Sequence, residues 1–214
     1  MKTAVADRSS EAQALLFSDL FHQLSQPLTA LQCALELSLA RDRTAEQFRS
    51  SVALALENSG RLRACLLRIR ALRDADDPGH PGTVAVEEIF RLLHEEMLPL
   101  LEAAAVCWRM EEMSASVQAD RAKLKAGLFH LFLHLLEEFH RGELRVRLQE
   151  VSRRRVQINI TLQAAVANGN PDGEFLLEIA RRSFRAMGGE LILCRTGGVR
   201  PLVEIRICLQ GGKR

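Results

Sequence analysis

The N-terminal third of the chain repeats apolar residues in steps of three and four, as one face of an amphipathic helix does. In the first of two such stretches these positions are Leu16, Leu20, Leu24, Leu28, Leu31, Leu35 and Leu39. In the second they are Phe48, Val52, Ala55, Leu62, Leu66, Ile69 and Leu72. The pattern predicts two helices of about thirty residues each, over 10–41 and 44–75.

Polar residues separate the two predicted helices and leave room for only a short connection. Asp42 and Arg43 interrupt the apolar pattern, and Gln47 follows Thr44 by three residues, which is the spacing of a capping box. So short a link requires the helices to lie side by side and antiparallel. A lone hairpin cannot cover both apolar stripes, so we expect residues 1–76 to form a homodimer, with two copies making a four-helix bundle.

Beyond residue 76 the periodicity changes. Residues 77–83 are rich in proline and glycine, which predicts a linker. Residues 84–214 then mix helical stretches with runs of alternating apolar residues, which predicts an α+β domain with helices on one face of one mixed sheet. The predicted helices cover 87–104, 120–139 and 174–187, and the predicted strands cover 84–86, 106–110, 116–118, 143–150, 156–162, 190–195 and 202–209.

Charge and composition exclude several classes of partner. The 214 residues carry a formal net charge of +2, which gives no strong field for binding nucleic acid or an anionic membrane. The five cysteines are dispersed and odd in number, which is typical of thiols in a reducing compartment. No apolar run approaches the ~20 residues of a membrane span, and no secretory signal precedes the first helix. We therefore expect a soluble, cytoplasmic protein without a nucleic-acid or membrane partner.

One histidine of the first helix stands in an unusual context. His22 lies off the leucine stripe, two residues before Leu24, so its ring is expected to face outward. Pro27 follows in the same helix, where it removes one backbone hydrogen bond. Together with Leu28, these residues resemble the H-box of the sensor histidine kinases, whose pattern is His-acidic-Leu-x-Thr/Asn-Pro-Leu.

Residues 84–214 resemble, in their order of elements, the catalytic ATP-binding domain of the same family, a Bergerat-type α/β sandwich. The residues of the nucleotide site are absent. His130 and His134 stand where the family's N-box carries two asparagines, the second of which holds Mg²⁺. Residues 163–167 stand where an aspartate box should grip adenine, and residues 174–177 where glycines should cradle phosphate. The resemblance therefore implies a degenerate ATPase-like domain that binds neither ATP nor another cofactor.

Gln23 departs from the H-box pattern and bears on the chemistry of His22. In the family an acid at this position takes the ring proton during autophosphorylation, and an amide cannot act as a base at neutral pH. Accepting a phosphoryl group from an aspartyl phosphate is less demanding, because a response-regulator receiver domain supplies its own Mg²⁺. The resemblance thus implies a histidine phosphotransfer protein in which His22 is the phosphoacceptor between receiver aspartates. Expected contacts with the receiver lie just past the histidine, at Ser25, Thr29 and Gln32.

Other interpretations stay open. Gln26, one turn after His22, could position water, which would make the protein a phosphatase of receiver aspartyl phosphate. The hairpin could instead be a non-enzymatic adaptor or inhibitor of a kinase or response regulator. His22 could also be an ordinary surface histidine, and Gln26 a solvated helix residue. The i, i+4 spacing of His130 and His134 would suit Zn²⁺, but no convincing further ligand completes the set, so we expect no metal site.

Overall fold

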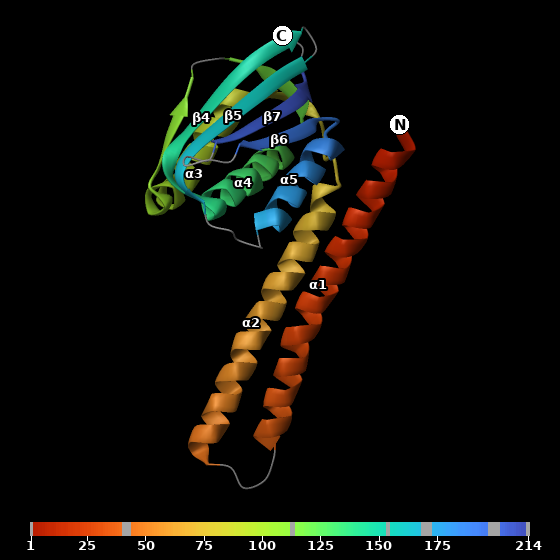
Figure 1. The fold of residues 1–214 in the computed structure, drawn as a ribbon, viewed down its shortest axis with the longest axis vertical. Helices are drawn as coiled ribbons and strands as arrows, with labels where there is room; N and C mark the ends of the chain where they lie inside the picture. The colour runs from red at the N-terminus through yellow and green to blue at the C-terminus, as the bar shows by residue number, and fades with distance from the viewer. Residues whose placement is uncertain are drawn as a thin grey trace. The chain divides into compact units, whose positions relative to one another are not determined.

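The structure, a computed structural model, describes residues 2–39, 44–111, 114–152, 155–167, 173–196 and 202–212 (Figure 1). The side chains of residues 1–20, 166, 167 and 173 lie outside this description. Contacts divide the chain into two compact units, residues 1–71 and residues 72–214. None of the helices in the described part of the chain combines the length and the apolar content that crossing a bilayer requires.

The first unit is a pair of long helices, α1 (Lys2–Leu39) and α2 (Ala45–Ala75). The last turn of α2, from Leu72 on, belongs to the second unit. The predicted capping box is confirmed: the Thr44 N–H donates to Gln47 Oε1 at 3.1 Å, and the Gln47 N–H donates to Thr44 Oγ1 at 3.2 Å. Helix α1 begins at Lys2 rather than at residue 10 as predicted. The reason is that neither proline nor glycine stands between these positions to stop a helix.

Small and polar residues, not the leucines, are the buried positions of this hairpin. Ala34 of α1 and Ala55, Asn58 and Cys65 of α2 are all buried. Leu16 and Leu20 of the predicted stripe fall among the side chains that are not described. Among its other members in the first unit, Ala55 is buried, and four are partly buried: Leu24, Leu31, Leu62 and Ile69. Its most exposed members are Leu28 at 56%, Leu35 at 49%, Leu39 at 85%, Phe48 at 50% and Leu66 at 59%. The hairpin therefore displays an apolar face that it does not cover itself.

The second unit is built on a five-stranded mixed sheet with the strand order β2-β4-β5-β7-β6. Its strands are β2 (Val106–Met110), β4 (Phe139–Ser152), β5 (Arg155–Ala167), β6 (Glu190–Thr196) and β7 (Leu202–Gln210). Strand β2 runs parallel to β4, and the other neighbouring pairs are antiparallel. The predicted α+β class with a mixed sheet is confirmed.

The prediction of a single sheet is wrong. Strands β1 (Gly82–Ala85) and β3 (Ser116–Ala119) pair with each other, antiparallel, in a separate two-stranded sheet. Each is four residues long, and pairing with each other satisfies their backbone groups without a place in the main sheet. One bridge, between Val117 and Gly211, touches the segment that follows β7.

Alternation along the strands places the core on one face of the sheet. In β5, Val156, Ile158, Ile160 and Leu162 are all buried, whereas the residues between them are not. Helices α3 (Val86–Ala104), α4 (Arg121–Glu138) and α5 (Gly173–Ala186) lie on one side of the sheet (Figure 1). They supply the fully buried rings Phe90, Phe132 and Phe184. Burying one such side chain stabilises the fold by about 1.5–3 kcal/mol, so this face holds the domain together.

Strands β4 and β5 are longer than predicted. β4 begins at Phe139, directly after α4, and β5 continues past Leu162 to Ala167, so that Phe139 pairs with Ala167. Gly142 permits this pairing, because a Cβ there would collide with the carbonyl oxygen of Gln163. Residues 163–167 carry little intrinsic strand preference, and the ladder with β4 overrides it.

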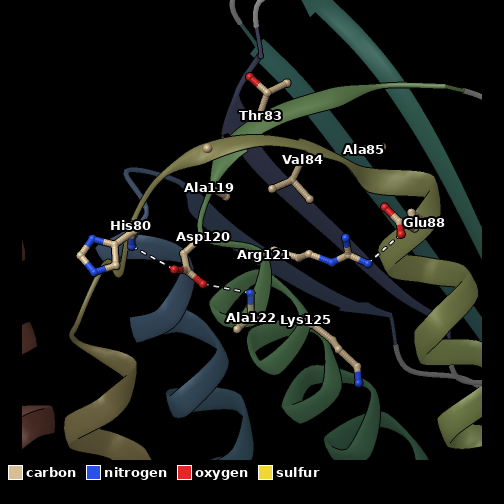
Figure 2. A pocket seen from close by; sticks show the side chains of 11 residues that line it. His80, Thr83, Val84, Ala85, Glu88, Ala119, Asp120, Arg121, Ala122 and Lys125 are labelled. Atoms are coloured by element: carbon tan, nitrogen blue, oxygen red, sulfur yellow. Dashed lines mark hydrogen bonds and ion pairs between the residues drawn. The ribbon is translucent and has the colours of Figure 1, made fainter.

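The turn before β1 is bound to the α/β domain through Asp120, the N-cap of α4. The Asp120 carboxylate accepts from the backbone N–H groups of His80 and Ala122, each at 2.9 Å (Figure 2). It also accepts from the backbone N–H of Lys123 at 3.0 Å. Gly79 has a φ of +66°, and a Cβ there would lie 2.6 Å from the same carboxylate. Hydrogen bonds from the backbone, that of His80 first, hold the pKa of Asp120 below its usual value.

Two cations of the domain reinforce this turn. Lys123 Nζ donates to the carbonyl oxygen of Asp74 at 2.7 Å and lies 3.2 Å from the carboxylate of Asp77. The buried side chain of Arg182 contacts Asp76 Oδ2 at 3.1 Å. The end of α2 and the turn that follows are therefore held by hydrogen bonds to α4 and α5.

We expect Asp120→Ala to lower the free energy of unfolding of the α/β domain by about 1–2 kcal/mol, since α4 loses its N-cap and the His80 N–H loses its acceptor. Asp120→Asn retains a capping oxygen, so its free energy of unfolding should fall clearly less than that of Asp120→Ala. Trp108, the single tryptophan of the chain, reports this domain by its fluorescence in urea. Equal losses in the two variants would contradict the capping role.

The same experiment has a defined pH dependence. Because the pKa of Asp120 is lowered in the folded state, its charge stabilises the domain above about pH 4 and ceases to do so as the pH falls through the folded value. The difference between the native protein and Asp120→Ala should therefore shrink in acid.

Candidate functional site

The predicted phosphoacceptor lies on an exposed face of α1. His22 is exposed, as the sequence predicts, and Gln26 is exposed one turn further on. Residues four apart in a helix are neighbours, and the side-chain Nε2 of Gln26 lies 2.8 Å from Nε2 of the His22 ring. The ring can be approached from solvent, with one amide side chain beside it.

The proposed receiver contacts are exposed as well, but their donors are in use within the helix. Ser25 Oγ donates to the carbonyl of Phe21 at 2.8 Å, and Thr29 Oγ1 donates to the carbonyl of Ser25 at 2.9 Å. The side-chain amide of Gln32 donates to Glu36 at 2.9 Å. With their protons engaged, the two hydroxyls can meet a partner as acceptors.

A groove of about 420 Å³ opens between α1 and α2 beside Gln26. Its polar lining comes from both helices: Gln23, Gln26, Asn58, Arg61 and Arg68. Arg68 Nη1 makes a long hydrogen bond of 3.4 Å to Gln23 Oε1, so the Gln23 side chain turns toward α2. Sequence reasoning missed the two arginines. Their spacing of seven residues, which repeats the same face of α2, was the available signal.

The two histidines of α4 have different surroundings. The Nδ1–H of His130 donates to the carbonyl of Ala126 at 2.7 Å, and burial lowers the pKa of this ring. His134 is 1% exposed, and its Nε2 lies 3.3 Å from Nη2 of Arg195 in β6. A guanidinium only donates, so Nε2 of His134 is the acceptor.

Arg195 ties the His134 ring into an ion-pair network. Its Nη1 lies 2.8 Å from Glu138 Oε1, and its Nη2 lies 3.7 Å from Glu174 Oε1. Glu138 Oε2 approaches His134 Nε2 at 3.4 Å. Burial raises the pKa of Glu138, and the positive charge of Arg195 opposes that rise. The network joins the end of α4, the start of α5 and strand β6. His134, one of its members, stands where the histidine-kinase pattern has a Mg²⁺-binding asparagine.

A second groove, of about 630 Å³, lies at the start of α4 (Figure 2). Arg121 and Lys125 lie along it, but Arg121 pairs with Glu88 at 2.7 Å and Lys125 pairs with Glu96 at 2.5 Å. Its cations are thus balanced within the domain. Across the part of the chain that the structure describes, no three His, Cys, Asp or Glu side chains converge as a metal site requires.

Comparisons with solved structures point to one fold. The chain is similar to the histidine kinase AdeS of Acinetobacter baumannii, with a TM-score of 0.62 and 17% identity over 88% of this chain and 98% of that one. It is similar to full-length ShkA, solved in complex with AMPPNP, with a TM-score of 0.57 and 18% identity over 94% of this chain and 46% of ShkA. For a mycobacterial sensor histidine kinase, MprB, the TM-score is 0.51 and the identity 15%, over 62% of this chain and 100% of that one.

These likenesses show that the chain has a histidine-kinase-like fold: a helical N-terminal region followed by a domain that resembles the catalytic domains of these proteins. No protein-family model matches the sequence, and no curated protein matches it.

We expect Arg195→Met to destabilise the α/β domain more at about pH 8 than at about pH 5. Without the guanidinium the pKa of Glu138 rises further, and a carboxyl whose folded pKa is raised costs stability as the pH rises through that value. The extra loss should be about 1 kcal/mol, because Arg195 is partly exposed to solvent. Urea titrations followed by Trp108 fluorescence at the two pH values measure it.

The double variant Arg195→Met/Glu138→Gln provides the control. A neutral amide replaces the titrating carboxyl, so the pH-dependent part of the loss should vanish. If the single variant loses the same amount at both pH values, Glu138 is not the group that Arg195 compensates.

Proposed function

We propose that this chain is a histidine phosphotransfer protein of two-component signalling. His22 accepts a phosphoryl group from the aspartyl phosphate of a response-regulator receiver domain and passes it to another receiver. The observation that carries this proposal is the exposure of the His22 ring, within an H-box-like sequence, on a helix of a histidine-kinase-like fold. An exposed ring nitrogen can line up with the phosphorus of a docked partner.

The transfer requires no general base from this chain. The lone pair of His22 Nε2 forms the P–N bond while the P–O bond to the aspartate breaks and the carboxylate leaves with the electron pair. The neutral ring carries its proton on Nδ1 during this step, so the attacking nitrogen has none to lose. The product is an Nε2-phosphorylated imidazolium, and water takes its Nδ1 proton. The Gln23 side chain, turned toward Arg68, is therefore not needed as a base. Mg²⁺ belongs to the receiver.

The α/β domain, in this proposal, binds no ATP and serves as a docking surface. Three observations support it. His134 is buried against Arg195 and Glu138 instead of offering an amide to a metal. Strand β5 continues through residues 163–167, where an adenine-binding loop would begin. Five residues, 168–172, then join β5 to α5. A chain without its own nucleotide would be loaded by a partner.

The hairpin is proposed to pair with a second copy through its uncovered apolar face. Leu28 and Leu35 of α1 and Leu66 of α2 are each about half exposed or more. Pairing two such faces removes both from water, which is the arrangement of a four-helix bundle.

The transfer itself can be tested with phosphorylated receiver domains carrying labelled phosphate. We expect label to move to the native protein and to be absent from His22→Ala, because alanine has no ring nitrogen to accept the phosphoryl group. Cys33→Ser, an exposed change on the same helix outside the predicted receiver contacts, should still accept label. Intact-protein and peptide mass spectrometry locate the phosphoryl group.

The other outcomes identify the competing functions. Loss of receiver phosphate to water without phosphohistidine, dependent on Gln26, would show a phosphatase. Binding to receivers or kinases that His22→Ala leaves intact, with no movement or loss of label, would show an adaptor. Micromolar binding of Mg·ATP would overturn the proposal for the α/β domain.

The dimer is tested by placing charge on the apolar face. We expect Leu28→Glu with Leu35→Glu to halve the mass measured by light scattering, because two buried carboxylates would cost far more than the apolar contact they replace. Cys33→Glu places one carboxylate on the exposed face of α1 that carries His22 and should leave the mass unchanged. A monomeric native protein with folded helices would contradict the proposed pairing.

A further inference from the structure

We propose that Gln26 is a positioning residue that masks the reactive nitrogen of His22. Its amide donates to Nε2, fixes the proton of the neutral ring on Nδ1, and must swing away before Nε2 can attack an electrophile. The inference deepens the proposed function, because it concerns the nitrogen that would carry the phosphoryl group. It can be measured without any phosphoryl donor.

The contact between the two side chains determines which of them donates. The Gln26 Nε2 atom lies 2.8 Å from the His22 Nε2 atom, well within hydrogen-bonding distance. An amide nitrogen has protons and no lone pair to offer, so the ring nitrogen must be the acceptor. The remaining proton of a neutral imidazole is then on Nδ1. The bond thus selects one of two tautomers.

The same bond occupies the lone pair that a transfer requires. A nitrogen that accepts a hydrogen bond along its lone pair cannot attack along that direction at the same time. The contact is exposed and competes with water, so it shields the nitrogen partially. Its removal should raise the reactivity of Nε2 about two- to tenfold, the ratio that corresponds to a net hydrogen bond of ~0.4–1.4 kcal/mol.

A groove beside His22 can hold the Gln26 side chain when it leaves the ring. It lines the 420 Å³ groove between α1 and α2, and Asn58, Arg61 and Arg68 line the same groove. These side chains offer donors to the Gln26 amide oxygen once the amide nitrogen has left the ring. A partner docked over His22 would displace the Gln26 amide into this groove. The His22 Nε2 atom would then be free to accept a phosphoryl group from that partner.

Substitutions at residue 26 give opposite expectations for the tautomer. In Gln26→Ala the ring loses its donor, and the Nδ1–H form should decrease. In Gln26→Glu the carboxylate can only accept, so the ring should place its proton on Nε2 and donate it. Glu36→Ala removes the equivalent i, i+4 contact of this helix, the 2.9 Å bond from Gln32, and should change nothing at His22.

The tautomer is read from imidazole ¹⁵N shifts of the full-length protein, labelled at histidine and held at a pH where the rings are neutral. The chain has six histidines, and comparison with His22→Gln assigns the signal. We expect Nδ1–H in the native protein and Nε2–H in Gln26→Glu. A native ring with its proton on Nε2 would overturn the proposal.

Reactivity is measured with diethyl pyrocarbonate, which acylates an unprotonated ring nitrogen. A C–N bond forms, ethyl carbonate leaves and breaks down to CO₂ and ethanol, and water takes the ring proton. Mass spectrometry of the peptide that holds His22 gives the rate. We expect Gln26→Ala to react about two- to tenfold faster than the native protein and than Glu36→Ala. An unchanged rate would refute the mask.

The two proposals fail separately. If the tautomer and the acylation rates follow these expectations while no receiver delivers label, the mask stands and the phosphotransfer function falls. If label arrives at His22 at equal rates in the native protein and in Gln26→Ala, with equal acylation rates, the function stands and the mask falls.

Discussion

The angular step of an α-helix, about 100° per residue, is the constraint on which the hairpin depends. It divides α1 into three faces that one rigid backbone holds in fixed relation. Ala34 and Pro27 are buried, Leu28 and Leu35 stand in solvent as an apolar stripe, and His22 is exposed on a third face. An insertion or deletion within α1 therefore changes the orientation of all three faces relative to one another. Inserting a single residue after Leu24 would rotate the stripe by about 100° relative to the ring of His22.

The α/β domain obeys a different constraint, the alternation of its strands. One face of the sheet carries the core, and the opposite face carries paired charges such as Arg147 with Glu111 at 2.6 Å. Helix α4 is buried on more than one side, because α5 packs closely against it. A Cβ at Gly127 would lie 3.1 Å from Cβ of Ser183, so glycine permits that approach. Close packing along α4 and the Arg195 network at its end together support our proposal that no nucleotide enters here.

Local features of the fold could be predicted from the sequence, and non-local ones could not. The capping box of Thr44 and Gln47 and the helix that opens after Asp120 are encoded within three or four residues, and the structure has both. The proximity of Gln26 to His22 follows from the same i, i+4 rule. By contrast, Arg195 meets His134 across 61 residues, and Gln23 meets Arg68 across 45.

The pairing of strands is non-local in the same way. Nothing in the residues of β1 indicates that it pairs with β3 and not with the main sheet, and the extension of β5 to Ala167 depends on β4 as its partner. The burial of Ala34, Ser51 and Asn58 in the hairpin escaped prediction for a related reason. A pattern of leucines shows which face is apolar, but not whether the second helix or a second chain covers it.

Gln23 and Gln26 have different chemical consequences. An acid at position 23 would strengthen the contact with Arg68, since a carboxylate binds a guanidinium better than an amide does. An acid at position 26 would draw the ring proton onto Nε2, the nitrogen that must attack. The amide of Gln26 instead leaves that nitrogen with its lone pair, which accepts the amide proton. A phosphotransfer protein must also pass the phosphoryl group on. Strong stabilisation of either the free or the phosphorylated His22 ring would therefore prevent one of the two transfers. The exposed amide contact of Gln26, worth no more than about 1.5 kcal/mol, biases the ring without trapping it, which is the behaviour that the proposed two-way transfer requires.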